Sequence, residues 1–402
     1  ELIEESVLLH MVSDVPVGAF LSGGIDSSAV VAQMVRLASD RVSTFSIGFT
    51  EGDYNELPFA RMLANRLGTE HHELVLEPNV LEILEDLTWH LDEPLGDPSV
   101  IPTYMVSKLA AQHGKVVLSG DGGDELFAGY DKYAVEGRER NYDMVPAPVR
   151  KLLGGLGEIL PEGAKGRNFL RHIALTGAAR RMDASSLFRP EEKKRLFQEQ
   201  LLHQFAAYDP RESTIKQLSR TNGNWLSSMQ YQDLKRYLPM DILVKVDRMS
   251  MAHSLEVRPP LLDHKLVEFA ATIPPELMLR GGTRKYIFKR AMRGILPDAI
   301  IDRPKRGFAI PLGRWFRGKL ADFLRDLLLS DTSRRRGIFR PAYIEHLLGL
   351  HKKGRDLDFQ LWTLISFEMW CRVYLDCTAR KPDRWRLGNS RPLRAVGERA
   401  PQ

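Results

Sequence analysis

Glycine, serine and aspartate are concentrated in one short stretch near the start of the chain, FLSGGIDSS at residues 20–28. An apolar run, VPVGAF, leads into it, and SAVVAQMVRLA, which follows, has the periodicity of a helix. A loop between a strand and a helix presents backbone N–H groups and the positive end of the helix dipole, and so favours phosphate. The residues that would add hydroxyl donors or let the backbone approach such a ligand are Ser22, Gly23, Gly24, Ser27 and Ser28.

Asp26 brings a negative charge into this phosphate loop. Two negative groups in contact repel each other unless a cation lies between them. Mg²⁺ is usually held by one or two carboxylates together with substrate phosphates. Asp26 therefore predicts a complex of metal and polyphosphate. The alternative is an ordinary turn in which Ser22 or Asp26 caps the helix. A capped turn does not require all the residues of the pattern S-G-G-x-D-S-S after a strand, so a functional loop is favoured.

A second loop of the same kind lies in VVLSGDGGDELFAGY, residues 116–130. Its acids, Asp121, Asp124 and Glu125, are close enough to raise one another's pKa, and a shared cation would relieve that repulsion. We therefore predict that Asp26 and Asp124 form a pair of Mg²⁺ ligands. For this segment taken alone, a solvated acidic turn remains an equal alternative.

Two basic segments in the second half of the chain are candidates to bind polyphosphate. Negative charge that develops on a leaving polyphosphate is stabilised by cations that bind it more strongly in the transition state. DILVKVDRMSMAHSLEVRPPLLD contains Lys245, Arg248 and Arg258, and DRPKRGFAIP contains Arg303, Lys305 and Arg306. The alternative is a solvated basic face, which suffices for Arg306.

The elements that must position these residues alternate over the first 130 residues. Alternation of strand and helix predicts right-handed crossovers and a parallel sheet with helices on both faces, which binds ligands at the carboxyl ends of its strands. Both glycine-rich loops lie at such ends. We predict an α/β, doubly wound, Rossmann-like sheet followed by a mainly helical region. The predicted strands are 17–21, 42–49, 71–76 and 115–119, and the predicted helices are 27–37, 57–67, 80–91 and 101–113.

Changes in composition divide the chain into four parts. We predict an α/β core at 1–135, a helical insertion or connector at 136–223, a helical region at 224–377 that completes the site, and a basic, disordered tail at 378–402. The formal charge of the whole chain is +5. The tail holds seven basic and two acidic residues, so it carries the whole excess. This location argues against a nucleic-acid ligand.

Other features exclude several classes of protein. No apolar run approaches the length of a membrane span, and the start of the chain has no basic region typical of a signal peptide. Two cysteines, Cys371 and Cys377, exclude a disulfide framework and fit buried apolar positions. We expect a soluble protein of a reducing compartment, the cytoplasm. For His71 and His72 a structural role is favoured over a zinc site.

The motifs together resemble a known family. SGGIDSS is similar to the loop of the N-type ATP pyrophosphatases, which cleave ATP to AMP and pyrophosphate. SGDGGDELFAGY, YLPMDILVKVDRMSMAHSLEVRPPLLDH, RKYIFKRAM and RPKRGFAIP, in this order, resemble the synthetase domain of glutamine-hydrolysing asparagine synthetases. The resemblance extends over residues 2–371 and implies a fold of the adenine nucleotide alpha hydrolase type.

The resemblance implies a role for each matching residue. Lys245 and Lys305 would contact phosphates, and Lys305 would stabilise the transition state. Asp121 stands where many members carry a glutamate implicated in the adenylate and ammonia steps, and its side chain is shorter by one methylene. Pyrophosphate and Mg²⁺ would be held by Ser22, Gly23, Gly24, Asp26, Ser27 and Ser28, with Asp124 as the second metal-side carboxylate. The adenosine site would be lined by Phe20, Leu21, Ile47, Ser119 and Gly120.

The implied reaction makes asparagine from ATP, aspartate and ammonia. The aspartate side chain would attack the α-phosphorus to give β-aspartyl-AMP and pyrophosphate, and ammonia would then displace AMP. Full-length members begin with a catalytic cysteine in a glutaminase domain, whereas this chain has no cysteine before Cys371 and begins with Glu1. We therefore expect a fragment, with use of free ammonia as the alternative.

Two other functions and the oligomeric state remain open at this stage. The same chemistry could act on another carboxylate acceptor, as in a cell-surface or secondary-metabolite pathway, or the fold could serve as a non-catalytic ATP-binding scaffold. Retention of both acidic loops and of Lys305 speaks against the scaffold. The sequence is compatible with a monomer or a homodimer.

Overall fold

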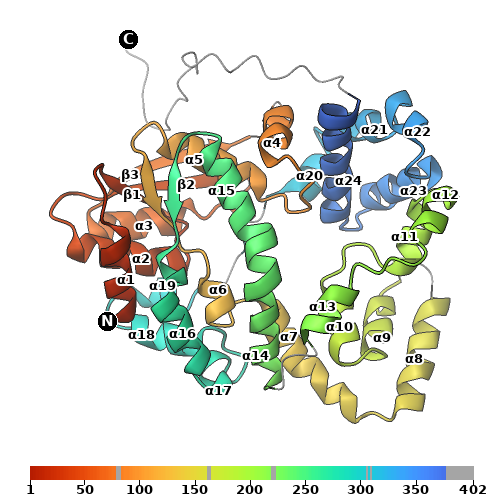
Figure 1. The fold of residues 1–402 in the computed structure, drawn as a ribbon, viewed down its shortest axis with the longest axis horizontal. Coiled ribbons are helices and arrows are strands. Elements are labelled where there is room, and N and C mark those ends of the chain that lie inside the picture. Colours follow the sequence, from red (N-terminus) through yellow and green to blue (C-terminus); the bar gives the residue numbers. More distant parts are fainter. Residues whose placement is uncertain (78–82, 161–163, 219–222, 305–306, 308–309, 377–402) are drawn as a thin grey trace.

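A five-stranded parallel sheet forms the centre of the α/β part of the chain (Figure 1). The computed structural model describes residues 1–77, 83–160, 164–218, 223–304, 307 and 310–376. The strands have the order β3-β2-β1-β4-β5. Their bounds are β1 (Val17–Phe20), β2 (Ser43–Phe49), β3 (Glu70–Leu76), β4 (Val116–Leu118) and β5 (Glu256–Arg258).

The direction of strand addition reverses between β1 and β4. The chain first proceeds from β1 to β2 and β3, and then returns to place β4 on the other side of β1. Ala19 pairs with Leu118, so the two strands end at nearly the same level. Such a switch point is where open α/β sheets bind ligands, and both glycine-rich loops begin there.

Helices cover both faces of the sheet, and alternate residues of the strands belong to two separate core clusters. Phe45, Ile47 and Phe49 of β2 face the first cluster, whereas Ala19 and Leu118 face the second. The first cluster is built with α4 (Leu84–Leu91), α5 (Val100–Ala110), α15 (Val244–Met251), α20 (Leu312–Arg317), α21 (Ala321–Leu328), α23 (Pro341–Lys352) and α24 (Asp358–Trp370). The second is built with α1 (Leu2–His10), α2 (Ile25–Leu37), α3 (Leu57–Leu67), α6 (Gly123–Leu126), α16 (His264–Thr272), α17 (Pro275–Met278), α18 (Tyr286–Met292) and α19 (Asp298–Ile301).

The predicted fold class is confirmed: a parallel sheet with helices on both faces is followed by helical segments. The four predicted strands of the first 130 residues correspond to β1–β4 and the four predicted helices to α2–α5, although residues 80–82 of the predicted helix at 80–91 lie outside the described residues. The strand β5 was missed within the region predicted to be helical. Its three residues are too few to show the period of two that marks a strand.

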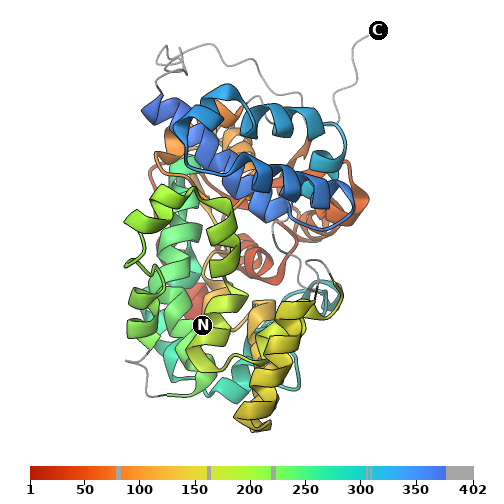
Figure 2. The same ribbon diagram turned by 90° about the vertical axis from the view of Figure 1, so that its right-hand side faces the viewer.

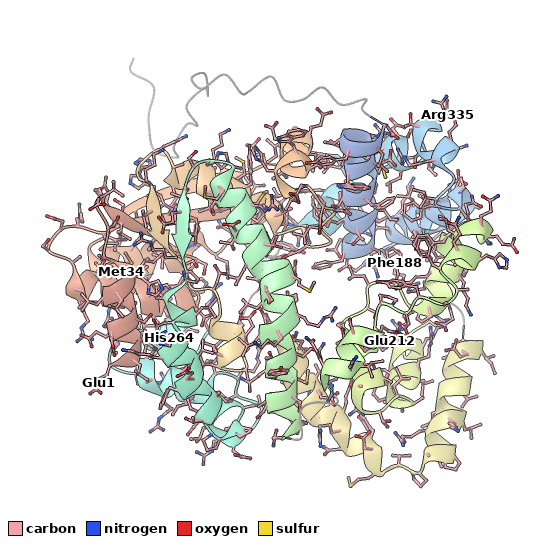
Figure 3. The ribbon with its side chains drawn as sticks, in the orientation of Figure 1. Glu1, Met34, Phe188, Glu212, His264 and Arg335 are labelled. Atoms are coloured by element: carbon pink, nitrogen blue, oxygen red, sulfur yellow. The ribbon has the colours of Figure 1, made fainter. Side chains whose placement is uncertain are left out.

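The helical segment after α6 forms a separate lobe at the lower right of Figure 1. Figure 2 shows that α8 and the C-terminal helices lie at opposite ends of this side of the molecule. The lobe is tied to the first core by Phe188, labelled in Figure 3, and by Gln360 Nε2, which donates a 3.2 Å hydrogen bond to the carbonyl of Leu187. Its helices are α7 (Asp131–Glu139), α8 (Ala147–Ile159), α9 (Arg167–Ile173), α10 (Gly177–Ala184), α11 (Pro190–Leu196), α12 (Glu199–Gln204) and α13 (Glu212–Leu218).

One long helix connects the lobe to the sheet. It comprises α14 (Trp225–Gln232), the π-helical segment η4 (Asp233–Leu243) and α15, and it crosses the molecule in green in Figure 1. Pro239 lies inside the π-helical segment. Among the helices that the structure describes, none is long and apolar enough to cross a membrane. The remaining elements are η1 (Gly52–Tyr54), η3 (Arg140–Met144), η5 (Pro260–Leu262), α22 (Asp331–Arg336) and the π-helical η6 (Cys371–Leu375).

A buried charge cluster stabilises the lobe and gives a stability prediction. The Arg180 side chain is 1% exposed and donates hydrogen bonds of 2.8 Å to Glu136 and Asp143. Arg180→Met would leave Glu136 buried without its cation, which costs about 3–5 kcal/mol. Urea unfolding should show this loss, whereas Arg138→Met, at an exposed site on α7, should change stability by less than about 0.5 kcal/mol. Equal effects of the two substitutions would contradict the assignment.

Candidate active site

The two glycine-rich loops pack against each other backbone to backbone. A Cβ atom on Gly120 would lie 2.6 Å from the backbone nitrogen of Ser27, so no side chain fits there. Gly23 has φ +73°, and a Cβ there would lie 2.8 Å from the backbone nitrogen of Ala60. The glycines of both loops therefore allow a close approach that other residues would prevent.

The first loop leaves the start of α2 available to an anion. Gly24 is the N-cap of α2, and no side chain caps this helix. The hydroxyls of Ser22 and Ser27 lie 3.1 Å apart, and Gly24 N–H donates to Ser22 Oγ at 3.2 Å. Ser28 is fully buried, and its hydroxyl has no hydrogen-bond partner among the described residues. The predicted phosphate loop thus combines hydroxyl groups with an uncapped helix N-terminus.

The carboxylates of Asp26 and Asp124 converge on one cation, the ammonium of Lys285. Its Nζ lies 2.5 Å from Asp26 Oδ1 and 2.6 Å from Asp124 Oδ1. The Lys285 side chain is 5% exposed. The pair of carboxylates predicted from the two loops is therefore brought together. Lys285 was not identified from the sequence, although it lies within the motif RKYIFKRAM.

These residues fit the magnesium ion that the family resemblance implies. Two carboxylates plus phosphate oxygens are a usual ligand set for Mg²⁺, and Asp26 and Asp124 already share one positive charge. Among the described residues, no group of three or more His, Cys, Asp or Glu side chains could hold a metal alone. Substrate phosphates would therefore have to complete the coordination.

Asp121 is influenced by charges from both the phosphate loop and Lys245. Ser119 Oγ donates a 2.7 Å hydrogen bond to Asp121 Oδ2. Burial raises the pKa of Asp121, and the negative charge of Asp26 adds to this, whereas the Ser119 hydrogen bond and the Lys245 ammonium oppose it. Burial likewise raises the pKa of the neighbouring Glu125, which accepts a 2.5 Å hydrogen bond from the Tyr130 hydroxyl. Both carboxyl groups therefore hold a proton more tightly than exposed ones do.

Lys245 is buried and contacts an acid outside the two loops. Its Nζ donates to Asp97 Oδ2 at 2.6 Å and to Ser99 Oγ at 2.7 Å. Burial would raise the pKa of Asp97, but the Lys245 ammonium and the hydrogen bonds from Lys245 and Ser99 outweigh it and lower that pKa. Lys245 is thus paired with Asp97 and close enough to Asp121 to affect its pKa, and its predicted contact with phosphate stays a prediction.

The long helix carries four polar residues at intervals of four: Asp233, Tyr237, Asp241 and Lys245. Asp241 among them interacts with Tyr237 and Lys245. Lys132 Nζ lies 2.6 Å from Asp233 Oδ1 and 4.7 Å from the centre of the Tyr237 ring. Sequence reasoning named only Lys245 among these four residues. The four-residue spacing of polar groups on a predicted helix was the signal that could have found the others.

The loop that carries Lys305 is attached to the phosphate loop. Lys305 itself, with Arg306, lies outside the described residues. Two residues before it, Arg303 donates a 3.0 Å hydrogen bond to the carbonyl of Gly23, forms an ion pair with Glu56, and stacks 4.0 Å from the centre of the Phe59 ring. The described start of this loop therefore contacts the predicted pyrophosphate site directly.

Arg248 and Arg258 do not join the site. Arg248 pairs with Asp92 at 2.8 Å on the surface. Arg258, at the end of β5, donates to the carbonyls of His10 and Val12 at 2.8 Å. Both side chains therefore have structural partners away from the two loops.

The residues predicted to line the adenosine site occupy both faces of the sheet. Phe20 and Ile47 face the first core cluster, whereas the side chain of Leu21 is fully buried in the second. Leu21 N–H also donates to the Phe45 carbonyl at 2.9 Å. A shared adenosine pocket for these residues remains a prediction, and for Leu21 it would require a contact other than its buried side chain.

His71 and His72 have partners that explain them without zinc. His71 Nδ1 lies 2.8 Å from Thr44 Oγ1, and the His72 ring stacks on that of His113 with 3.8 Å between centroids. Cys371 is fully buried, in agreement with the apolar role expected from the sequence. Cys377 lies outside the described residues, as does the predicted tail 378–402.

Comparison with known proteins identifies relatives along almost the whole chain. The profile of a family described as "Asparagine synthase" matches residues 1–372. The chain is 34% identical over 379 residues to "Asparagine synthetase [glutamine-hydrolyzing] 1" of Bacillus subtilis, covering 94% of this chain and 59% of that protein. It is 26% identical to "Asparagine synthetase [glutamine-hydrolyzing] 3" of the same organism, with 76% of this chain and 46% of that protein covered. Another relative, "Amidase chyE" of Penicillium rubens, is 26% identical, with 82% and 54% covered.

The space beside Lys285 gives a prediction about loop packing. A Cβ atom on Gly129 would lie 1.9 Å from Asp124 Oδ1 and 2.2 Å from Lys285 Cε. Gly129→Ala would therefore displace the ion pair and lower stability by about 1–3 kcal/mol. Gly155→Ala on α8, where a Cβ meets nothing within 4 Å, should instead raise stability by about 0.4–1 kcal/mol. Denaturant midpoints of the two variants should shift in opposite directions, and a stabilised Gly129→Ala would refute this packing.

Asp241 makes stability depend on pH. Burial and the nearby Asp97 carboxylate raise its pKa to about 6, against the Lys245 ammonium. The folded state therefore binds this proton more tightly than the unfolded state, and the resulting stabilisation is lost as the pH rises from about 4 to about 6. Over this range, wild type should lose up to about 3 kcal/mol relative to Asp241→Asn, since one pKa unit is worth about 1.4 kcal/mol.

This pH dependence can be checked by urea unfolding at closely spaced pH values. Asp322→Asn, at an exposed position on α21, is the matched substitution control. A constant difference between wild type and Asp241→Asn across pH 4–7 would contradict the raised pKa.

Proposed function

Because the chain belongs to the asparagine synthase family, we propose that it is an ATP-dependent amide-forming ligase that adenylates the side chain of aspartate and transfers ammonia to it, giving asparagine. The chain spans about three fifths of the length of its Bacillus subtilis relative. The proposal concerns residues 1–402 acting on ATP, aspartate and ammonia in the cytoplasm. The single observation that supports it most is the convergence of Asp26 and Asp124 on one cation beside the uncapped start of α2.

In the first step, an oxygen of the acceptor carboxylate attacks the α-phosphorus of ATP. The bond between that phosphorus and the oxygen that bridges the α- and β-phosphates breaks, and pyrophosphate leaves. The leaving pyrophosphate would lie at the N-terminus of α2, where backbone N–H groups and the Ser22 and Ser27 hydroxyls can donate to it. Asp26 and Asp124 would hold Mg²⁺, which when bound supplies neutralising charge to the polyphosphate. Lys305 would stabilise the same developing charge. It follows two residues after Arg303, which donates a hydrogen bond to the carbonyl of Gly23 in the phosphate loop.

In the second step, ammonia attacks the acyl carbon, the bond to AMP breaks, and the nitrogen loses a proton. Asp121 is suited to accept that proton because burial raises its pKa above that of an ordinary carboxyl group. Ser119 fixes its orientation through the 2.7 Å hydrogen bond. The side chain of Asp121 has one methylene less than the glutamate of many members, so we propose a closer approach of the adenylate to the second loop.

The charges around the site suit an amino acid as acceptor. A zwitterion needs an anion for its ammonium group and a cation for its α-carboxylate. Asp233 and Asp241 lie on the long helix, and Lys132 Nζ lies 2.6 Å from Asp233 Oδ1. We propose that these groups recognise the backbone ends of aspartate, which leaves its side-chain carboxylate free to react.

Another carboxylate acceptor is the second candidate function. It is supported by the similarity to Amidase chyE, a relative named as an amidase and not as an asparagine synthetase. The adenylation and amide-forming steps would be unchanged, because the two glycine-rich loops act on ATP and not on the acceptor.

Pyrophosphate release from Mg²⁺ and ATP tests the proposal. We expect release that depends on aspartate, and asparagine when ammonium is added. Release with other carboxylates only would replace the first function with the second, and a chain that binds ATP but adenylates no acid would be a scaffold.

Asp26→Asn should lower the rate of pyrophosphate release by at least about a hundredfold, because it removes a carboxylate that would hold the ion that neutralises the leaving pyrophosphate, and loss of one such stabilising group typically costs about that much. Circular dichroism should show that the variant is folded. Asp40→Asn, an exposed aspartate after α2, is the control and should retain activity. An active Asp26→Asn would contradict the metal-ligand role.

A further inference from the structure

Lys285 occupies the position between the two carboxylates where a cation was predicted. It lies 259 residues from Asp26 in the chain, and its ammonium contacts both oxygens of that side chain as well as Asp124 Oδ1. The lysine side chain is 5% exposed, whereas those of Asp26 and Asp124 are 20% and 17% exposed. The ammonium group therefore belongs to a side chain that is more deeply buried than those of the two carboxylates that it joins.

The surrounding backbone is shaped for this ion pair. Lys285 has φ 53° and ψ 35°, a left-handed conformation that is rare for a residue with a side chain, and it is the N-cap of α18. Its carbonyl accepts the 2.8 Å hydrogen bond of Lys289 N–H. Gly129 leaves room for Lys285 Cε, and Gly123 leaves room for Asp26 Oδ1, 2.6 Å from where a Cβ would stand. An unfavourable conformation persists where its surroundings require it.

We propose that Lys285 is the resident cation of the Asp26–Asp124 pair in the nucleotide-free chain, and that it gives up both carboxylates to a divalent cation when nucleotide binds. This inference rests on the proposed function, since it concerns the same site. It adds that the metal position is not vacant before ATP arrives.

The charges explain why an exchange is required. Asp26 and Asp124 carry two negative charges, of which Lys285 balances one. A divalent cation on the same oxygens would lie within a few ångströms of the ammonium, and like charges at that distance repel. Polyphosphate oxygens bring the negative charge that the displaced ammonium needs as a new partner. The flexible four-carbon side chain allows this movement while the backbone at the start of α18 stays in place.

The competing explanation is a permanent structural ion pair. In that case Lys285 stays on Asp26 and Asp124 at all times, and removal of the lysine would only destabilise the protein. The two explanations differ in what a metal ion does when the lysine is absent and no nucleotide is present.

Mn²⁺ binding to the nucleotide-free chain, followed by electron paramagnetic resonance, separates the two explanations. Lys285→Met should bind Mn²⁺ at least about tenfold more tightly than wild type, because one repulsive charge has been removed from the site. Mn²⁺ should also raise the melting temperature of Lys285→Met, whereas wild type should need Mn²⁺ together with pyrophosphate for a comparable rise. Lys289→Met, one turn later on α18 and without an ion pair to either carboxylate in the described structure, should behave as wild type.

Two outcomes would overturn the inference. One is equal Mn²⁺ affinity of Lys285→Met and wild type, and the other is a gain that persists in the double variant Lys285→Met, Asp26→Asn. A Lys285→Met chain that does not fold even with millimolar Mn²⁺ also contradicts it, since the metal should replace the missing ammonium. Pyrophosphate release by wild type without a gain in Lys285→Met would refute only this inference, whereas a gain without pyrophosphate release by wild type would refute only the proposed function.

Discussion

Repulsion between two carboxylates that the fold forces together is the constraint on which the rest of the site depends. The parallel pairing of β1 with β4 brings the two glycine-rich loops to one level, and Gly120 removes the side chain that would keep them apart. Asp26 and Asp124 then lie on the same cation. Like charges held this close destabilise a fold unless a cation compensates. The buried ammonium of Lys285, which lies 259 residues after Asp26 in the sequence, provides that compensation.

The same demand for charge balance extends outward from the loops. Asp121 and Glu125 follow in the second loop, and burial shifts both toward their neutral forms. Further out, Lys245 neutralises Asp97, and Lys132 contacts Asp233. The long helix carries Asp233 and Lys245, and its π-helical segment is a form often found at functional sites. Each of these acids thus has its charge reduced, either by an ammonium partner or by a raised pKa.

Much of the fold could be predicted from local sequence, because apolar runs and glycine-rich turns alternate regularly in the first 130 residues. The strands β1–β4 and both loops were predictable, and so was the meeting of Asp26 with Asp124, since the carboxyl ends of parallel strands share one edge. The strand β5 was not predictable, because three residues have no readable period and their pairing with β4 depends on a chain segment over 130 residues away. Lys285 was missed for a similar reason: its left-handed backbone and its partners become visible only when α18 is placed.

The balance of charge also bears on the form in which nucleotide enters. Near the phosphate loop, Asp26 and Asp124 share the ammonium of Lys285, which balances one of their two negative charges. A bare polyphosphate would meet net negative charge there and be repelled beyond the reach of the α2 N-terminus. A metal-bound polyphosphate brings positive charge to the two carboxylates and negative charge to the N-terminus of α2. One ligand therefore interacts favourably with both groups. In the proposed reaction, the loop would therefore select the metal complex of the nucleotide over the free nucleotide, through the aspartate that lies within it.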